Sequence, residues 1–168
     1  MHQLSIDQVK KISPEVLLKL IQRAKDFLKK NDVIKEMCKT YDITPDFIDL
    51  VPMKFGDLDV SARTAKGVIT LNYKLLCDGD FFNDYHYLAH ELEHFCQQCF
   101  GDVATQGANE GDYLANPFEQ EGFQRQIEYL DHMYGENKAE DYVEHLLDHH
   151  DKNGKEREKL EKVLTEKI

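Results

Sequence analysis

The chain has 168 residues, which is enough for one domain with a sizeable hydrophobic core. Its 32 acidic residues outnumber its 21 basic residues, and the net charge of -11 repels nucleic acid phosphates and anionic lipid. We therefore expect neither nucleic acid nor a membrane as a partner. The sequence shows no signal-peptide pattern and no run of 18 apolar residues, so a soluble cytoplasmic protein is expected.

The first third of the chain has the patterning of helices. Ser13 has the position of an N-cap, Pro14 stands in the first turn, and apolar residues recur every three or four positions as far as Leu28. A second, short helix is expected over residues 33–41, and Thr44 opens a further turn. This part of the chain is therefore predicted to be helical.

The stretch "MKFGDLDVSARTAKGVITLNYKLL" begins at Met53 and alternates apolar with polar positions. A turn is expected at residues 65–67, so the pattern predicts a hairpin of two strands. The second strand, over residues 67–75, is either an edge strand that accepts an extended peptide or an interior strand of the sheet.

Helical patterning returns after residue 80. A helix is predicted over residues 81–100 and ends at Gly101, which stands where a C-cap glycine is common. The loop of residues 101–115 is rich in Gly, Asp and Asn, and we interpret it as a lid. Asn116 and Pro117 then form a cap and first turn for the next helix.

The remaining residues, 136–168, predict two helices with a break near Asn153. The whole pattern predicts an α+β fold that is mainly helical, with a small sheet beside the helix of residues 81–100. We expect a single domain over 1–168, divided into 1–50, 51–135 and 136–168.

The segment from His90 to His94 reads His-Glu-Leu-Glu-His. Residues four apart lie on nearly the same face of a helix, so both imidazoles can reach one ion at about 2.0 Å. Glu91 lies beside them, angled to meet a water molecule on that ion. Zinc hydrolases use this pattern, with the glutamate as general base and not as a ligand. We therefore predict one Zn²⁺ ion bound by His90 and His94, with Glu91 as the catalytic residue.

A tetrahedral ion needs a third protein ligand, and the helix after Pro117 offers Glu119 and Glu121. They lie about 200° apart around that helix, so only one of them can face the ion. An apolar stripe is centred near the direction of Glu119, where a buried carboxylate requires a compensating cation. Its members are Phe118, Gly122, Phe123, Ile127, Leu130, Met133 and Tyr134. We predict Glu119 as the third ligand and keep Glu121 as the alternative.

Cys96 and Cys99 have the C-x-x-C spacing of zinc and redox sites. On the same helix they point about 180–240° away from His90, so they cannot complete the histidine site. They also lie near a helix C-terminus, where thiolates are not stabilised. We predict buried, reduced core cysteines.

His145 and His149 are also spaced by four residues, with Asp148 beside His149. A second metal site is one interpretation of this spacing. A solvated helix face, or a lid over the cleft, is the interpretation that we favour, because no third ligand is evident.

The motif from His90 to His94, followed by "NPFEQEGF", resembles the small gluzincins, and the ImmA/IrrE group of compact cytoplasmic and phage-associated proteases is the nearest comparison. The resemblance covers roughly residues 65–135. It implies a zincin-like fold, a zinc ion with a glutamate ligand matched to Glu119, and Glu91 as the base that activates water. The chain departs from that pattern at Gly122, where alanine is usual, and in lacking an apolar "LLMP"-like continuation.

The predicted function is therefore that of a zinc metallopeptidase acting on a peptide or protein substrate. The alternative is a non-catalytic binding or regulatory protein in which zinc holds two helices together. Contacts to the substrate or to the developing oxyanion are expected from three residues that flank the motif: His86, Tyr113 and Arg125.

Overall fold

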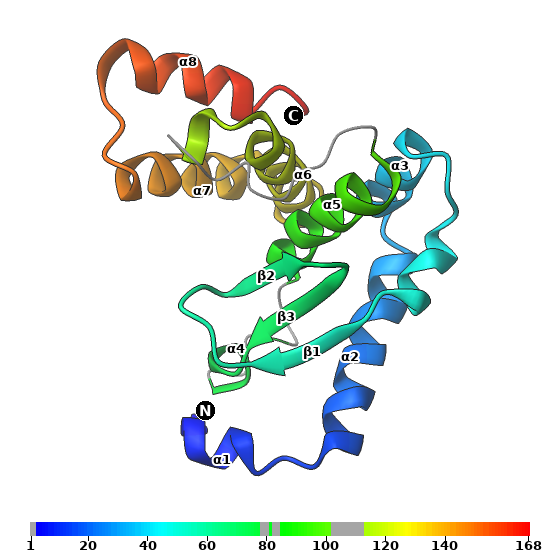
Figure 1. The fold of residues 1–168 in the computed structure, drawn as a ribbon. Coiled ribbons are helices and arrows are strands. Elements are labelled where there is room, and N and C mark those ends of the chain that lie inside the picture. The colour runs from blue at the N-terminus through cyan, green and yellow to red at the C-terminus, as the bar shows by residue number, and fades with distance from the viewer. Residues whose placement is uncertain (1–2, 78–80, 82–84, 102–112) are drawn as a thin grey trace.

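The computed structural model describes residues 3–77, 81, 85–101 and 113–168. Its elements form two groups, which we name the N-terminal lobe (described residues 3–101) and the C-terminal lobe (residues 113–168). Figure 1 shows the sheet and the first helices at one end of the molecule, and the helices of the C-terminal lobe gathered at the other. The N-terminal lobe contains α1 (Ile6–Lys10), α2 (Pro14–Lys29), α3 (Asp32–Thr40), η1 (Pro45–Leu50), β1 (Met53–Gly56), β2 (Ala62–Ala65), β3 (Val68–Asn72), α4 (Lys74–Cys77) and α5 (His86–Phe100). The C-terminal lobe contains η3 (Tyr113–Ala115), α6 (Pro117–Tyr134), α7 (Glu136–His149) and α8 (Gly154–Leu164).

The N-terminal helices begin at side chains that cap them. Ser13 accepts a hydrogen bond from the Val16 backbone N–H at the start of α2. Asn31 accepts from the backbone N–H groups of Val33 and Ile34, so it is the N-cap of α3 as well as the point where α2 has ended. The helices predicted for this part of the chain are confirmed.

The sheet has three strands in the order β1-β3-β2, so the prediction of a two-stranded hairpin was incomplete. The predicted turn is confirmed: Lys66 and Gly67 both have positive φ angles, 52° and 74°, and join β2 to antiparallel β3. β1 pairs with β3 in parallel, so β3 is the interior strand. The chain leaves β3 after Asn72 and forms α4, where the sequence pattern predicted a longer strand.

One face of the sheet is covered by α5, which packs against β2 and β3. Ala62 and Thr64 of β2 pair with Leu71 and Ile69 of β3, and since side chains alternate along a strand, all four lie on this face. Ile69 and Leu71 are fully buried. The α5 helix begins at His86, five residues later than predicted, and Tyr85 occupies its N-cap position.

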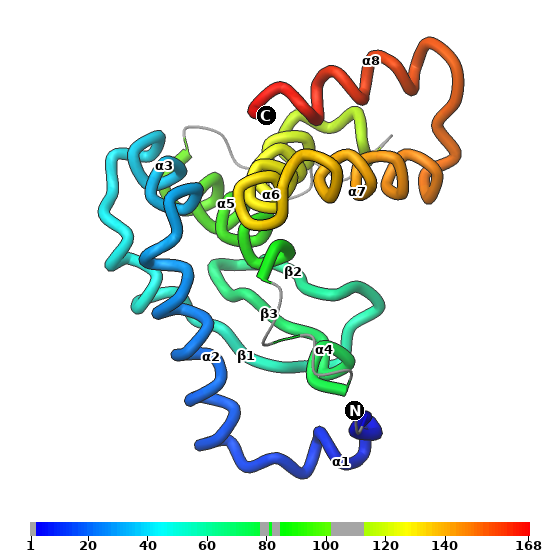
Figure 2. The backbone as a smooth tube through the Cα atoms, turned by 180° about the vertical axis from the view of Figure 1, so that it is seen from behind, coloured from blue at the N-terminus to red at the C-terminus, as the bar shows by residue number. Residues whose placement is uncertain are grey.

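The C-terminal lobe is helical and has its own hydrophobic cluster. Its central helix, α6, begins after the predicted cap Asn116, which accepts from the Phe118 backbone N–H. Figure 2 shows α6 between α5 on one side and α7 and α8 on the other, and α6 packs against all three. The fold is α+β, as predicted, with far more helix than strand. Within the described residues, no helix has the length and apolarity needed to cross a membrane.

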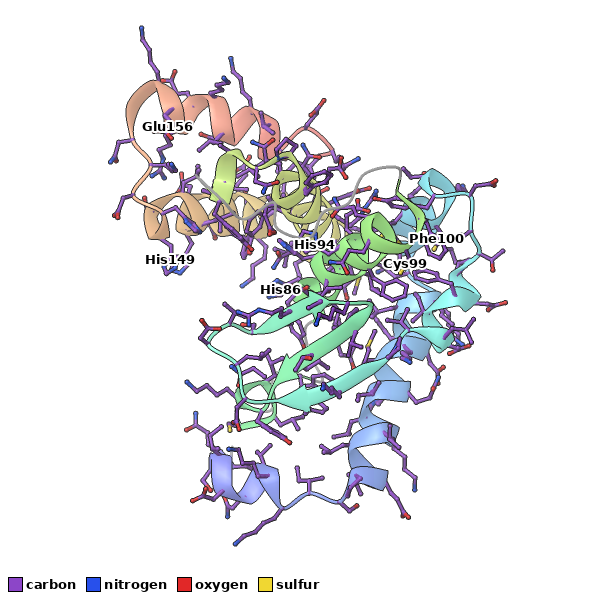
Figure 3. The ribbon with its side chains drawn as sticks, viewed as in Figure 1. His86, His94, Cys99, Phe100, His149 and Glu156 are labelled. Carbon is purple, nitrogen blue, oxygen red and sulfur yellow. The ribbon has the colours of Figure 1, made fainter. Side chains whose placement is uncertain are left out.

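The prediction for the cysteines is correct for Cys96, which is fully buried, and wrong for Cys99, which is exposed near the end of α5. Figure 3 shows Cys99 beside Phe100 at the end of α5 away from the C-terminal lobe. The helix runs beyond the core there, so its last turn meets solvent. All four cysteines are free thiols, and burial raises the pKa of Cys38 to about 11.

Candidate metal centre

Three side chains from two helices converge between the lobes. The Nε2 atoms of His90 and His94 lie 3.0 Å apart, and Glu119 Oε1 lies 3.1 Å from the first and 2.7 Å from the second. His90 and His94 come from α5, and Glu119 comes from the first turn of α6. Among the described residues, this is the one group of three His, Cys, Asp or Glu side chains close enough to share an ion.

The second nitrogen of each imidazole is held by a glutamine. His94 Nδ1 lies 2.8 Å from Gln97 Oε1, and the amide nitrogen of Gln97 donates to Glu121 Oε2 and to the Phe118 carbonyl. Carboxylate and carbonyl oxygens only accept, so the orientation of the Gln97 amide is fixed. Its oxygen therefore faces His94, and His94 Nδ1 must carry the proton.

His90 has the same arrangement with a partner from the other helix. Its Nδ1 lies 3.0 Å from Gln126 Oε1, and the Gln126 amide nitrogen lies 2.6 Å from His86 Nδ1. With Nδ1 donating to Gln126, the lone pair of His90 Nε2 points at the cluster. In the neutral form of each imidazole, Nε2 is therefore the unprotonated nitrogen, and it faces Glu119.

Three lone-pair donors at these distances repel one another unless a cation lies among them. A proton is one such cation: burial alone lowers the pKa of His94, but the hydrogen bond and charge of Glu119 outweigh burial and raise that pKa to about 9. Burial raises the pKa of Glu119, but the hydrogen bonds and charges of the two histidines lower that pKa by more than burial raises it. The carboxylate is therefore ionised. Two imidazoles and a carboxylate are also a zinc-type donor set, whose atoms lie about 3.3 Å apart around a tetrahedral ion. The residues therefore fit a metal ion.

The two candidate glutamates have different places. Glu119 is buried and faces the histidines, whereas Glu121 is exposed and accepts the Gln97 hydrogen bond. The alternative in which Glu121 binds the ion does not fit this geometry, because Glu121 contacts His94 only through Gln97. One turn along α6, Gly122 lies against the His90 ring, where an added Cβ would be 2.9 Å from Nε2. Glycine at this position thus leaves room for the imidazole.

Glu91 is buried beside the cluster and takes no part in the triad. The Thr64 hydroxyl lies 2.6 Å from Glu91 Oε2, a short hydrogen bond to a carboxylate. Thr64 reaches it because β2 directs this side chain toward α5. One carboxylate oxygen of Glu91 is therefore held by the sheet.

A cleft of about 690 Å³ opens beside His90 and Glu91. Its walls come from both lobes, including β2, α5, α6 and α7. The lining residues are Ser61, Ala62, Leu75, His86, Tyr87, His90, Glu91, Tyr113, Phe123, Gln126, Tyr134, Lys138 and Tyr142. A cleft of this size can accept a substrate segment next to the cluster.

Two of the three residues expected to contact substrate lie in this cleft. His86 lines it one turn before His90, and Figure 3 shows His86 and His94 on the part of α5 near the C-terminal lobe. Tyr113 also lines it, and burial together with the Glu119 charge raises the pKa of Tyr113, so its hydroxyl stays protonated. The predicted lid falls largely on residues 102–112, which lie outside the described part of the chain.

The third residue expected to contact substrate, Arg125, does not line the cleft. Its side chain is buried and donates to Glu93 on α5 and to Glu128 on its own helix, so it does not reach the cleft. The apolar stripe of α6 did not reveal this, because α6 is buried on more than one side. Arg125 is instead a buried ion-pair contact between the two lobes.

The second histidine pair has no partner cluster within the described residues. His145 and His149 are both exposed on α7, and Figure 3 shows His149 at the end of α7 away from α5. No acidic or cysteine side chain completes a group of three with them in the described chain. The solvated helix face is the interpretation that fits.

Sequence reasoning missed Thr64, Gln97 and Gln126. Gln97 could have been found, because it lies three residues after His94 on the same helical face, within reach of its ring. Gln126 and Thr64 come from other elements, so their contacts depend on how α6 and β2 dock on α5. No local pattern signals such contacts.

The comparisons with known proteins give no match: no family model fits the sequence, and neither a curated protein nor a solved structure is significantly similar to it. Function is therefore argued from the geometry of the site.

Proposed function

We propose that the protein is a zinc metallopeptidase of the zincin-like type, with His90, His94 and Glu119 as ligands of one zinc ion and Glu91 as general base. The observation that carries this proposal is the position of Glu91. It lies next to the ligand cluster, is held by Thr64, and lines the cleft. A bound zinc ion would lower the pKa of a water molecule and polarise a substrate carbonyl.

The residues of the chain divide the chemistry among them. Glu91 Oε2 is held by the Thr64 hydroxyl, so Oε1 is available to take a proton from the attacking water and to return it to the leaving amine. The hydroxyl of Tyr113 and the ring of His86 line the same cleft and are donors for the oxygen of the tetrahedral intermediate. Gln97 and Gln126 keep both imidazoles in the tautomer that binds metal.

The resemblance of the HExxH and "NPFEQEGF" motifs to small gluzincins, and to the ImmA/IrrE group in particular, supports the same proposal. In this chain the usual alanine is replaced by Gly122, and the closeness of that residue to the His90 ring gives the replacement a physical reason.

A structural zinc in a binding or regulatory protein is the second candidate. Structural zinc sites use four protein ligands and exclude solvent, whereas the described residues provide three ligand atoms beside an open cleft. A glutamate that is held beside the ligands without joining them also has no purpose in a purely structural site. These two observations favour the peptidase.

The test compares Glu91→Gln with the unchanged protein and with Glu144→Gln, an exposed substitution on α7. Metal content is measured by mass spectrometry, and hydrolysis is measured on casein and on a degenerate peptide library. We expect one zinc per chain in all three proteins, and a loss of at least about a hundredfold in hydrolysis for Glu91→Gln alone. Zinc binding without any hydrolysis by the unchanged protein would favour the structural candidate.

A further inference from the structure

The cleft beside Glu91 has more aromatic surface than metal binding requires. Five rings line it: Tyr87, Tyr113, Phe123, Tyr134 and Tyr142. Phe123 packs edge-on against His90, with ring centroids 4.5 Å apart, so the aromatic wall begins at the metal cluster. Tyr113 and Tyr134 remain 39% and 44% exposed. An apolar group in the cleft would cover this surface, and the stabilisation is proportional to the area removed from water.

The charge of the cleft differs from that of the rest of the molecule. The chain carries a net charge of -11, yet Glu91 is the one carboxylate among the described residues that line the cleft. Lys138 of α7 lines it as well, is exposed, and forms no ion pair within the described chain. With a divalent ion bound, this cleft would be a positive region on an acidic protein, which attracts an anionic group.

Lys138 lies on a different wall of the cleft from the metal cluster. His86 lies one turn from His90 on α5, its ring is 5.6 Å from that of Tyr142, and Tyr142 lies one turn from Lys138 on α7. All four side chains line the cleft. An extended peptide covers about 3.3 Å per residue, so a segment of a few residues would connect the cluster to Lys138.

From these observations we infer the substrate class: a peptide with a bulky aromatic or apolar side chain next to the scissile bond, and a carboxylate a few residues away that binds Lys138. The position of the scissile bond rests on the proposed function, whereas the aromatic and anionic preferences rest on the cleft. The carboxylate belongs either to an Asp or Glu side chain or to the C-terminus of the peptide.

Binding is tested on the zinc-loaded Glu91→Gln protein, which does not consume the peptide. The probes are hexapeptides of Gly and Ala that contain one Phe, with a Glu placed two, three or four residues from it and both ends blocked. A second set has a free C-terminus at the same spacings and no Glu, and a third set has Gln in place of Glu with both ends blocked. Affinities are measured by competition with a fluorescent peptide.

We expect the best carboxylate peptide to bind about fivefold more tightly than its neutral counterpart, with the difference lost at high salt. Replacing Phe by Ala should weaken binding about tenfold. Lys138→Gln should abolish the carboxylate preference, whereas Lys155→Gln, an exposed lysine near the start of α8, should retain it. A preference for the blocked Glu peptides would identify the carboxylate as an internal side chain. A preference for the peptides with a free C-terminus would identify it as the C-terminal carboxylate.

Equal binding of Glu, free-acid and Gln peptides would overturn the inference, and so would a carboxylate preference that survives Lys138→Gln. The proposed function is tested separately. If the unchanged protein cleaves none of these peptides while the binding preferences hold, the aromatic and anionic preferences of the cleft are supported and the peptidase proposal is rejected. Cleavage without either preference would leave the peptidase and reject the substrate class.

Discussion

The two lobes contribute to the site in different ways. The N-terminal lobe holds the proposed general base within itself, because Glu91 of α5 is fixed by Thr64 of β2. The ligand cluster is instead divided between the lobes: two histidines come from α5, and Glu119 comes from α6. Metal affinity should therefore depend on how the lobes dock, whereas the orientation of the base should not.

The hydrogen bonds behind the ligands follow the same division. His90 is held by Gln126 from the opposite lobe, and Gln97, which holds His94, is itself fixed by Phe118 and Glu121 of α6. The C-terminal lobe has its own hydrophobic cluster, whereas the cluster of the N-terminal lobe also includes Tyr129 of α6. The interface between the lobes is thus a place where folding and metal binding depend on each other.

The largest effect is expected from removing the ligand that the C-terminal lobe supplies. Glu119→Ala removes a ligand, and we expect zinc affinity to fall by at least about a thousandfold and hydrolysis to be lost. Glu121→Ala is the matched control two residues away, and it should cost about ten- to a hundredfold, because Glu121 acts through Gln97. Both are measured by competition with a chelator at constant pH. A larger loss of zinc in Glu121→Ala would show that α6 is rotated from the described position.

Gly122→Ala tests the closeness of α6 to His90. Alanine in a helix interior normally stabilises by about 1 kcal/mol relative to glycine. Here the new Cβ would lie 2.9 Å from His90 Nε2, so the ring must move away from Glu119. We expect zinc affinity to fall by about a hundredfold. If Gly122→Ala raises the melting temperature and leaves zinc affinity unchanged, the His90 ring can accommodate the added methyl group, and the expected clash is contradicted.

Thr64→Val tests the part of the site that lies within the N-terminal lobe. Loss of a hydrogen bond to a carboxylate should lower kcat about tenfold or more, while zinc affinity stays within about twofold. Thr64→Ser restores the hydroxyl and should recover most of the activity. Thr70→Val, on β3, is the control, since Thr70 pairs with Arg63 and lies on the other face of the sheet. A parallel loss of zinc in Thr64→Val would mean that the base and the ligands are not independent.

The effect that is smallest per step, about tenfold for each unit, is a dependence on pH. Because the pKa of His94 in the metal-free protein is raised from 6.5 to about 9, its proton must leave before the metal binds. Apparent zinc affinity should therefore fall about tenfold for each pH unit below 9. The raised pKa also stabilises the metal-free fold, fully below pH 6.5, and this contribution is lost as the pH rises through 9. Calorimetry of the metal-free protein should show its melting temperature falling over that interval, with no such trend attributable to His94 once zinc is bound.

The sequence was most informative where one helix decides the geometry. The spacing of His90, Glu91 and His94 fixes their directions on α5, and the apolar stripe of α6 distinguishes Glu119 from Glu121. The third strand was missed because β1 pairs with β3 although β2 lies between them in the sequence, and alternation alone does not reveal such a pairing. The contacts of Arg125 were missed for a related reason. Its partner Glu93 belongs to another helix, so the sequence of α6 alone does not show that the Arg125 side chain is buried in an ion pair.

The contact between α5 and α6 is made to an unusual degree by polar side chains with fixed partners. Glu93 meets Arg125, Gln97 meets Glu121, and His90 meets Gln126. Helices that pack through leucine and alanine can slide by a turn and remain well packed. A slide of one turn here would leave buried donors and acceptors unpaired, at a cost of about 1–3 kcal/mol for each. These polar pairs therefore favour the observed docked position, in which the three candidate ligand atoms are assembled before an ion binds.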